Sequence, residues 1–477
     1  MRQSSALLTA LVAVLFCATA HGEARRPNLI VIVTDDQGYW SIGAYGNNES
    51  RTPNMDRLAR EGALFTNAFV NTPVCSPSRA TFLTGLHGTQ LGITDWINMN
   101  DADAGVGLPP STVTWPELLK QNGYATALVG KWHLGHLPQF HPTRHGYDHF
   151  WGIPDGGAAA MNPWIEVGGK REQLKGPTPD LTTDEAMRWI TEQRDKSFAL
   201  SLHFREPHLP YGPVPEEDSK PFADLNPTVP DYQALNPKFT KERLREYYAA
   251  VHSIDRNLGR LLAKLEELKL ADNTIVWFTS DNGYNVGHHV VHGKGNGTWI
   301  GGGVPGPMRP NMYEESIRVP LIVRWPGVVK PGRRIEQPVM NVDTFATVCG
   351  MLGLAPPADH KQHGRDFSPL LRGESISDWP IVTFGQFDIH LLGIDFMRMA
   401  RTSDWKLVRH HMHDGHNEMF DLKNDPLEKQ NRYYDKRVAA VRDELQKQLT
   451  AWQESIGDPL LKLDANRPIE PGPPIGQ

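Results

Sequence analysis

The chain has 477 residues, a formal net charge of −6 and only three cysteines. This length predicts one large domain together with a smaller one. The weakly acidic balance provides no general attraction to nucleic acid or sulfated polymers, so any bound anion must be held by local groups. We find no basic tract suited to nucleic-acid binding. Three cysteines are too few for a disulfide framework.

The first 22 residues have the pattern of a cleaved secretory signal peptide. Arg2 precedes a short apolar run from Ala6 to Phe16, and small residues close the segment. The run is too short for a comfortable membrane span. We therefore expect a secreted or periplasmic protein without stable membrane insertion, and an uncleaved N-terminal anchor is the alternative.

Short β-branched runs alternate with helical patterns in the following part of the chain. Apolar residues spaced by three and four positions predict a helix at 241–268. This alternation predicts an α/β domain over residues 23–375, with a large mixed, mostly parallel sheet sandwiched by helices. Its buried strands are predicted at 28–34, 124–129, 198–204 and 274–279.

Beyond about residue 375 the pattern changes to short strands separated by tight turns. A helix at 437–456 should follow the strands, and the proline-rich end at 468–477 should be unpacked. We predict a smaller C-terminal α+β subdomain with an antiparallel sheet over residues 376–477. Its strands are predicted at 381–384, 398–401, 405–408 and 418–422.

Polar side chains follow each of the four buried strands of the large domain. In open α/β sheets, ligands bind beyond the carboxyl ends of the strands, so these side chains form a candidate site. Those after the first and fourth strands offer only oxygen, which suits calcium or magnesium and not zinc. Turn formation and helix capping are the alternative for each pair alone. In chain order the residues are Asp35, Asp36, Lys131, His133, His208, Asp281 and Asn282.

The segment from Cys75 to Gly85 carries the most specific motif. Pro77 suits the start of a helix and Gly85 its end. Cys75 would then lie at the helix N-terminus, where backbone N–H groups favour an anion, and Arg79 one turn further on the same face. The motif predicts an oxyanion pocket with a nucleophile. A plain reactive-cysteine hydrolase is the rival interpretation.

With these motifs the sequence resembles the type I sulfatases of the alkaline phosphatase superfamily. Cys-x-Pro-x-Arg at 75–79 is similar to the signature that directs oxidation of the cysteine to formylglycine, and residues 130–135 are similar to the family's second signature. The resemblance extends from about residue 26 to about residue 431. Further matches in the same order are Asp35-Asp36, Pro207-His208-x-Pro210, Ser280-Asp281-Asn282-Gly283 and Ile317-Arg318-Val319-Pro320.

The resemblance implies a sulfuric ester hydrolase acting on a sulfated small molecule or glycan. It implies that the hydrated aldehyde at position 75 attacks sulfur with help from Arg79, and that its second hydroxyl later expels sulfate. It also implies a formylglycine-generating maturation enzyme as a partner. The implied ligands of one calcium ion are Asp35, Asp36, Asp281, Asn282 and the modified Cys75.

The same resemblance implies roles for the basic residues. His133 would orient or deprotonate the hydrate, and Lys131 would stabilise charge near the nucleophile. His208 and a second lysine would bind sulfate, and one of them would protonate the leaving alcohol. The chain departs from the family here, because its candidate lysine, Lys294, lies unusually far before the Tyr313 region. We choose Lys294, with Arg309 as the alternative.

Several other residues are weaker candidates. His288, His289 and His292 could line the pocket or form a second metal site. Trp164 and the loop at 155–175 could form a sugar-stacking wall, and Cys349 is predicted to be a buried small hydrophobe. A C-terminal group could form part of the substrate rim or a solvated surface: His410, His411, His413 and His416.

Two other functions compete with sulfate ester hydrolysis. A phosphonate or phosphate monoester hydrolase could use the same scaffold, because the tetrahedral anions differ little in shape. A catalytically silent glycan-binding protein could retain the fold, although the intact set of Cys75, Arg79, Lys131, His133 and His208 argues against this. The pattern leaves open the substrate, its regiochemistry, exo or endo action and the oligomeric state.

Overall fold

A computed structural model describes residues 25–464 of the chain. The predicted signal peptide and the end at 468–477 lie outside these residues. A ten-stranded sheet forms the centre of the molecule, in the order β14-β2-β13-β9-β1-β8-β4-β5-β6-β7. Its strands are β1 (Asn28–Thr34), β2 (Ala63–Phe65), β4 (Ala125–Lys131), β5 (His149–Ile153), β6 (Trp164–Val167), β7 (Lys170–Gln173), β8 (Phe198–His203), β9 (Thr274–Ser280), β13 (Leu321–Arg324) and β14 (Arg333–Ile335).

The four strands predicted from sequence are neighbours at the middle of this sheet. β9, β1, β8 and β4 pair in parallel, and β1 is buried along its whole length. Parallel strands covered on both faces have near-continuous apolar sequences, as these do. Antiparallel pairing of β13 with β9 and of β6 with β5 makes the sheet mixed.

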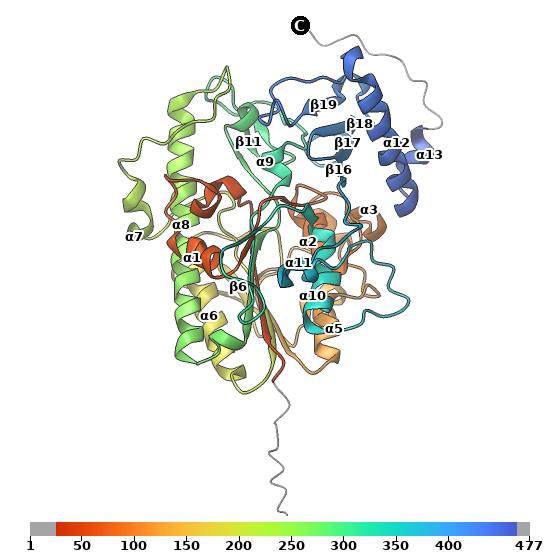
Figure 1. The fold of residues 1–477 in the computed structure, drawn as a ribbon. Helices are drawn as coiled ribbons and strands as arrows, with labels where there is room; N and C mark the ends of the chain where they lie inside the picture. Colours follow the sequence, from red (N-terminus) through yellow and green to blue (C-terminus); the bar gives the residue numbers. More distant parts are fainter. Residues whose placement is uncertain (1–24, 465–477) are drawn as a thin grey trace, which may run out of the picture.

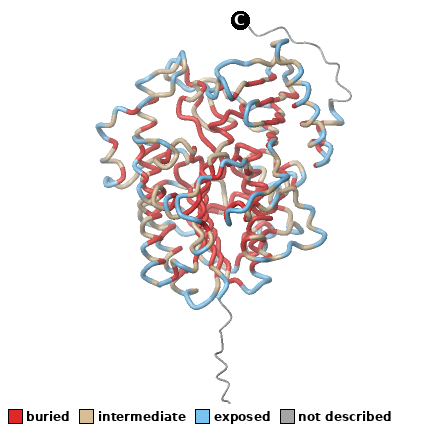
Figure 2. The backbone as a smooth tube through the Cα atoms, in the orientation of Figure 1, coloured by how far each residue is buried: buried red, intermediate tan, exposed pale blue. Residues whose placement is uncertain are grey.

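Helices cover both faces of the sheet, as Figure 1 shows. Alternate residues of β1 point to opposite faces, so Leu29 and Val31 belong to one core and Ile30 and Ile32 to the other. The first core contains α2 (Cys75–Thr84), α5 (Trp115–Gln121), α10 (Thr344–Leu352) and α11 (Ser368–Arg372). The second contains α1 (Pro53–Glu61), α6 (Thr178–Gln193) and α8 (Pro237–Glu267). Buried backbone is concentrated along the sheet in Figure 2.

A second, four-stranded antiparallel sheet forms the C-terminal part, with α12 (Ala439–Ile456) packed against it. Three short strands, β10 (Asn285–Val286), β11 (Val291–Gly293) and β12 (Thr298–Trp299), form a ribbon beside the main sheet, near α9 (Glu314–Ile317). The strands of the C-terminal sheet are β16 (Thr383–Ile389), β17 (Asp395–Arg401), β18 (Trp405–His410) and β19 (Glu418–Asp421).

The remaining elements are short. Two strands, β3 (Ala68–Phe69) and β15 (Val339–Met340), pair with each other. No helix among residues 25–464 is long and apolar enough to cross a membrane. The short helices are α3 (Gly88–Leu91), α4 (Met99–Asp103), α7 (Glu216–Ser219) and α13 (Leu460–Asp464).

The fold confirms the predicted architecture, and the differences are at element ends. α8 begins four residues before the predicted start, because Asn236 caps it and Pro237 occupies its first turn. β16 and β17 extend three to five residues beyond the predicted strands, since cross-strand pairing continues to Ile389 and Asp395. The short and hairpin strands were not predicted, because two to five residues carry too little periodicity.

Candidate active site

The candidate site lies where β1, β4, β8 and β9 end. Thr34 of β1 is in register with Ser280 of β9, so the residues that follow these two strands are adjacent. The backbone N–H of Asp281 donates to the carbonyl of Thr34 at 3.0 Å, and that of Asp35 to Glu206 after β8 at 3.1 Å. The parallel register therefore brings together side chains that are about 250 residues apart in the chain.

Three carboxylates form the base of the site. Asp35, Asp36 and Asp281 are buried, and each offers an oxygen within 4.8 Å of the others. Asn282 donates to Asp36 at 2.7 Å, while its own buried Oδ1 has no hydrogen-bond partner. Buried carboxylates and an unused amide oxygen are the donors that hard divalent cations prefer, so the residues fit a calcium or magnesium ion.

Cys75 occupies the first turn of α2, as the motif predicted. α2 ends at Gly85, whose φ of 68° is the left-handed C-cap conformation. The Cys75 sulfur lies 3.5 Å from Asp35 and 2.8 Å from the Lys294 ammonium. Burial, followed by the charge of Asp35, raises the pKa of the Cys75 thiol to about 12. The unmodified thiol is therefore protonated at neutral pH, which disfavours the reactive-cysteine interpretation.

Arg79 and Lys131 lie beneath the carboxylates and do not line the cavity. Arg79 donates through Nε to Asp281 at 2.9 Å, and Lys131 contacts Asp35 at 2.5 Å. Burial by itself would raise the pKa of Asp35, but the charges of Lys131, His208, Arg79 and Lys294 hold it well below its usual value. The lysines and Arg79 therefore keep Asp35 ionised, whereas burial, followed by the charge of Asp35, raises the pKa of Asp281 to about 6.

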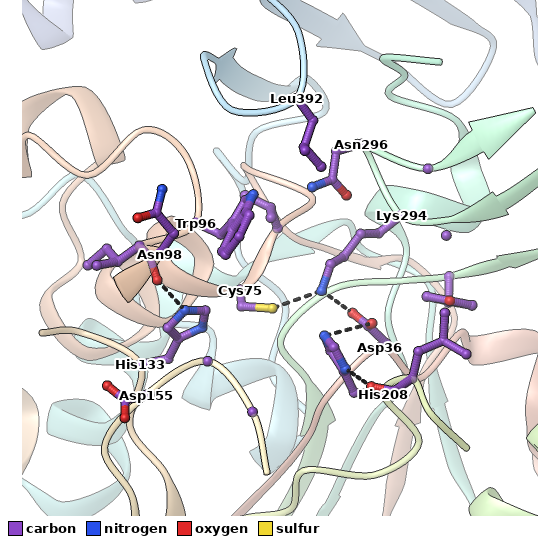
Figure 3. Close-up of a pocket in the computed structure, with 18 of the residues that line it drawn as sticks. Asp36, Cys75, Trp96, Asn98, His133, Asp155, His208, Lys294, Asn296 and Leu392 are labelled. Atoms are coloured by element: carbon purple, nitrogen blue, oxygen red, sulfur yellow. Dashed lines mark hydrogen bonds and ion pairs between the residues drawn. The ribbon is translucent and has the colours of Figure 1, made fainter. Parts of the chain in front are cut away.

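Lys294 and His208 line the cavity on the side of Cys75 away from His133, as Figure 3 shows. Lys294 extends from the ribbon next to β11 and contacts Asp36 at 2.5 Å. His208 lies 3.8 Å from Asp36, and its Nδ1 hydrogen-bonds the carbonyl of Leu209 at 2.6 Å. Its side chain is 28% exposed, through the cavity. The Nε2 atom therefore carries the polar chemistry that His208 can offer a ligand.

His133 completes the ring around Cys75. Its Nε2 hydrogen-bonds the carbonyl of Ile97 at 2.9 Å, and its buried Nδ1 has no hydrogen-bond partner. Burial, and then the charge of Lys131, lowers the pKa of His133 well below its usual value. A neutral imidazole that donates through Nε2 leaves Nδ1 as an acceptor, so His133 can orient or receive a proton.

A cavity of about 620 Å³ opens above these residues. Its walls combine apolar side chains, including Trp96 and Leu392, with polar ones, including Asn98, Asp155 and Asn296 (Figure 3). Polar and apolar walls together suit a ligand that has both hydroxyls and a carbon framework. The 155–175 loop contributes Asp155 and Arg171 to the cavity lining, which does not include Trp164, the residue predicted to stack on a sugar.

The structure also separates the weaker candidates. His292 lines the cavity and hydrogen-bonds the Tyr211 hydroxyl at 2.8 Å, whereas His288 packs at a tilted angle against Trp40. His289 lies elsewhere, in a buried group with Glu315 and Glu428 that could hold a metal. Cys349 is buried, as predicted.

Arg309 and the C-terminal histidines do not line the catalytic cavity. Arg309, His289, His410 and His416 line a second cavity, on the other side of the ribbon. His410 and His411 are buried, so a solvated surface is wrong for these two. Lys294, and not Arg309, is the cation that contacts Cys75.

Sequence reasoning missed several residues of the site. His203 is buried against Arg79, with 3.4 Å between its Nδ1 and the guanidinium, and Ser78 bonds the carbonyl of Asp281. His203 ends β8, so its position at a strand end was the available signal. Trp96, Asn98 and Asn296 come from loops without regular periodicity, which no pattern would have identified.

Comparisons with known proteins agree with this geometry. The sulfatase family matches residues 27–354, and the family described as N-sulphoglucosamine sulphohydrolase, C-terminal, matches residues 309–455. An N-acetylgalactosamine-6-sulfatase of Canis lupus familiaris is 32% identical, over 92% of this chain and 89% of the relative. A steryl-sulfatase of Rattus norvegicus is 32% identical, over 82% of this chain and 78% of the relative.

Solved structures show the same fold. A protein in complex with its substrate D-glucosamine-2-N,6-O-disulfate has a TM-score of 0.78 and 26% identity, over 91% of this chain and 99% of that one. A phosphonate monoester hydrolase of Agrobacterium radiobacter has a TM-score of 0.73 and 23% identity, over 90% of this chain and 96% of that one. The second likeness shows the fold alone.

Proposed function

This chain belongs to the sulfatase family and is a sulfuric ester hydrolase, and on that premise we propose that it cleaves sulfate monoesters of carbohydrates with formylglycine at position 75 and one calcium ion. The observation that carries the proposal is the position of Cys75. It lies at the start of α2, between the carboxylate cluster and Lys294. The relatives and the chemistry of the site both support sulfate ester hydrolysis.

The residues fit the two groups that the family implies. Asp35, Asp36, Asp281 and Asn282 would hold calcium together with position 75, because they supply clustered oxygen donors. When present, calcium supplies Lewis acidity, and the hydrated aldehyde supplies two hydroxyls on one carbon, one for attack and one for release of sulfate. A maturation enzyme would have to oxidise Cys75 before the chain folds, since the side chain is only 2% exposed.

The basic residues have different roles because they lie at different places in the site. Lys294 and His208 face the cavity, so they bind the sulfate group and balance the charge that develops on its oxygens. One of them protonates the leaving alcohol. His133, through Nδ1, orients the nucleophile or takes its proton. Arg79 and Lys131 act from below, by holding Asp281 and Asp35 in place.

We infer that the alcohol is a sugar because of the polar rim. Asn98, Asp155 and Asn296 line the cavity beside Trp96, and amide and carboxylate groups can bond sugar hydroxyls while an indole packs on a ring. Asp155 is held by His136 at 2.8 Å, so its carboxylate is oriented in advance. The sugar-sulfate relatives support the same assignment.

We also propose that the protein is exported, with residues 1–22 as a cleaved signal peptide. The division into a catalytic domain, 23–375, and a C-terminal subdomain, 376–477, belongs to the proposal as well. The change from a mostly parallel to an antiparallel sheet near Thr383 supports that boundary.

The first test is mass spectrometry of the Cys75 peptide from protein made together with a sulfatase-maturation enzyme. Formylglycine should be found at position 75, and the protein should release sulfate from at least one compound of a panel of sulfated monosaccharides, an aryl sulfate and a steryl sulfate. An unmodified thiol, beside a control sulfatase that is converted, would contradict the mechanism. Faster turnover of phosphonate or phosphate monoesters would favour the alternative hydrolase.

The calcium site is tested without activity. Calcium that binds only the folded state stabilises it, by about 2.7 kcal/mol at one hundred times the dissociation constant. We expect the unfolding midpoint of wild type to rise with calcium, and the rise to be lost in Asn282→Ala. Asn296→Ala, a cavity residue outside the carboxylate cluster, should keep it. An equal rise in both variants would place the ion elsewhere.

A further inference from the structure

The second cavity has a volume of about 1050 Å³ and lies between the large domain and the C-terminal sheet. Side chains from both parts line it, and the ring of Tyr313 packs against Phe420 of β19 with centroids 6.2 Å apart. Figure 1 shows β11 and α9 beside the C-terminal sheet in this region. The cavity takes no part in the chemistry described above.

We propose that this cavity is a second saccharide subsite, which binds a sugar unit bearing one anionic group in an oligomeric substrate. The inference rests on the proposed function, since it adds a subsite to a carbohydrate sulfatase. Three kinds of group support it: hydrogen-bond acceptors, aromatic rings and a cation.

Buried acceptors provide the first argument. Asp395 is 1% exposed, and its Oδ1 has no hydrogen-bond partner, while its other oxygen bonds His410 at 2.6 Å. Glu418 has an oxygen without a hydrogen-bond partner, 3.6 Å from the other nitrogen of His410. Buried carboxylate oxygens of this kind favour a ligand with several O–H or N–H donors, as a sugar has.

Aromatic rings provide the second argument. Tyr434 is 47% exposed and Tyr232 is half-buried, and both line the cavity. Rings that show part of their apolar surface beside polar groups suit the C–H face of a sugar. An apolar ligand would leave the carboxylate oxygens without donors, and an inorganic ion would leave the rings without a contact.

The charge of the lining provides the third argument. Asp231 pairs with Lys429 at 2.7 Å, and Glu428 pairs with Lys406 at 2.5 Å. Arg309 is exposed and lies over the Tyr313 ring. Of the arginines and lysines among the described residues that line the cavity, Arg309 is the one for which the structure gives no ion pair. A planar guanidinium beside an aromatic ring suits a sulfate or uronate group.

The two cavities are close together, because residues that are paired with each other line one cavity and the other. Thr298 lines the catalytic cavity and Met308 the second one, and these two residues form an antiparallel bridge. Neighbouring strands lie about 5 Å apart. Leu392 and Asp395, three residues apart, line the first and the second cavity.

The test compares sulfate release from a sulfated monosaccharide with release from a tetrasaccharide that ends in the same sugar. Wild type should prefer the tetrasaccharide by about tenfold in kcat/KM, the usual effect of one charged hydrogen bond. Arg309→Ala should lose this preference through KM, with the monosaccharide rate kept within about twofold. Arg144→Ala, an exposed arginine in neither cavity lining, should behave as wild type.

The outcomes separate the two proposals. If wild type releases no sulfate from any monosaccharide of the panel or from the tetrasaccharide, the proposed carbohydrate function fails. If wild type releases sulfate but shows no preference for the tetrasaccharide, or if Arg309→Ala keeps the preference, the proposed subsite is wrong. Asp395→Asn, which keeps the side-chain shape, provides a second variant that should also reduce the preference.

Discussion

At the residue scale, the site separates side chains that line the cavity from side chains that hold the carboxylates beneath it. Lys294 and His208 reach the cavity, whereas Arg79 and Lys131 are buried below it against Asp281 and Asp35. Removing a cavity cation removes a direct contact with developing charge. Removing a lower cation also leaves a buried carboxylate without its partner, which costs stability as well as rate.

Lys294→Ala tests the choice between the two candidate cations. The variant loses an ammonium 2.8 Å from position 75, so we expect kcat/KM for a monosaccharide sulfate to fall by about 10²- to 10³-fold. Arg309→Ala is the matched control and should retain this activity, because Arg309 lines the second cavity. The reverse pattern in steady-state kinetics would exchange the two assignments.

At the element scale, Gly130 allows the central strands β4 and β8 to pack closely against each other. A Cβ on Gly130 of β4 would lie 1.9 Å from the carbonyl oxygen of His203 in β8, and its φ is +117°. Gly130 directly precedes Lys131, so the close approach of the strands also sets the height of that lysine beneath Asp35. The close packing of β4 against β8 therefore explains why position 130 is a glycine.

Gly130→Ala should destabilise the protein by more than about 3 kcal/mol, since it adds a backbone clash to an unfavourable φ. Gly46→Ala is the control: its φ is +107°, but an added Cβ would have nothing within 4 Å. Gly46→Ala should lower the free energy of unfolding by about 1 kcal/mol. Urea unfolding measures both, and equal losses would show that the contact with His203 has no cost.

The pairing of β17 with β18 creates a pH-dependent contribution to stability. Burial by itself lowers the pKa of His410, but the hydrogen bond to Asp395 and the carboxylate of Glu418, 3.6 Å away, raise it to about 9. His413 and His416 are the other titratable groups nearby. A folded-state pKa above the unfolded value of about 6.5 gives stability that is full below pH 6.5 and is lost as pH rises through 9.

His410→Gln should remove that pH dependence. We expect wild type to lose about 3 kcal/mol more than the variant between pH 6 and pH 9.5, from the difference between the two pKa values. Urea unfolding of both proteins at several pH values measures this difference. Because both proteins contain the other titrating groups, the contributions of those groups cancel. Parallel curves for the two proteins would show that His410 is not charged in the folded state.

At the scale of the whole molecule, buried ion pairs join the C-terminal sheet to the large domain. Arg401 of β17 bonds Glu314 of α9 at 2.8 Å, and Lys406 of β18 contacts Glu314 at 3.0 Å and Glu428 at 2.5 Å. Glu428 lies 3.9 Å from His289, next to the ribbon that carries Lys294. The C-terminal sheet thus supports the segment that supplies Lys294.

Lys406→Met should be strongly destabilising, by about 3–5 kcal/mol, because it leaves two buried glutamates without their shared cation. Lys423→Met, at an exposed position, should be nearly neutral. Calorimetry on both variants checks this. A loss below about 1 kcal/mol in Lys406→Met would mean that the ion pairs do not hold the two parts together.

The sequence by itself determined the family, the class of the fold and most of the side chains that meet at the strand ends. Cys75, the strand-end acids and the four central strands have local patterns, which each segment carries in its own residues. Only the tertiary structure decided which strands are neighbours, that Lys294 and not Arg309 contacts position 75, and that Arg309 and His410 share a separate cavity. Those outcomes depend on packing between segments far apart in the chain, and local periodicity contains no information about such contacts.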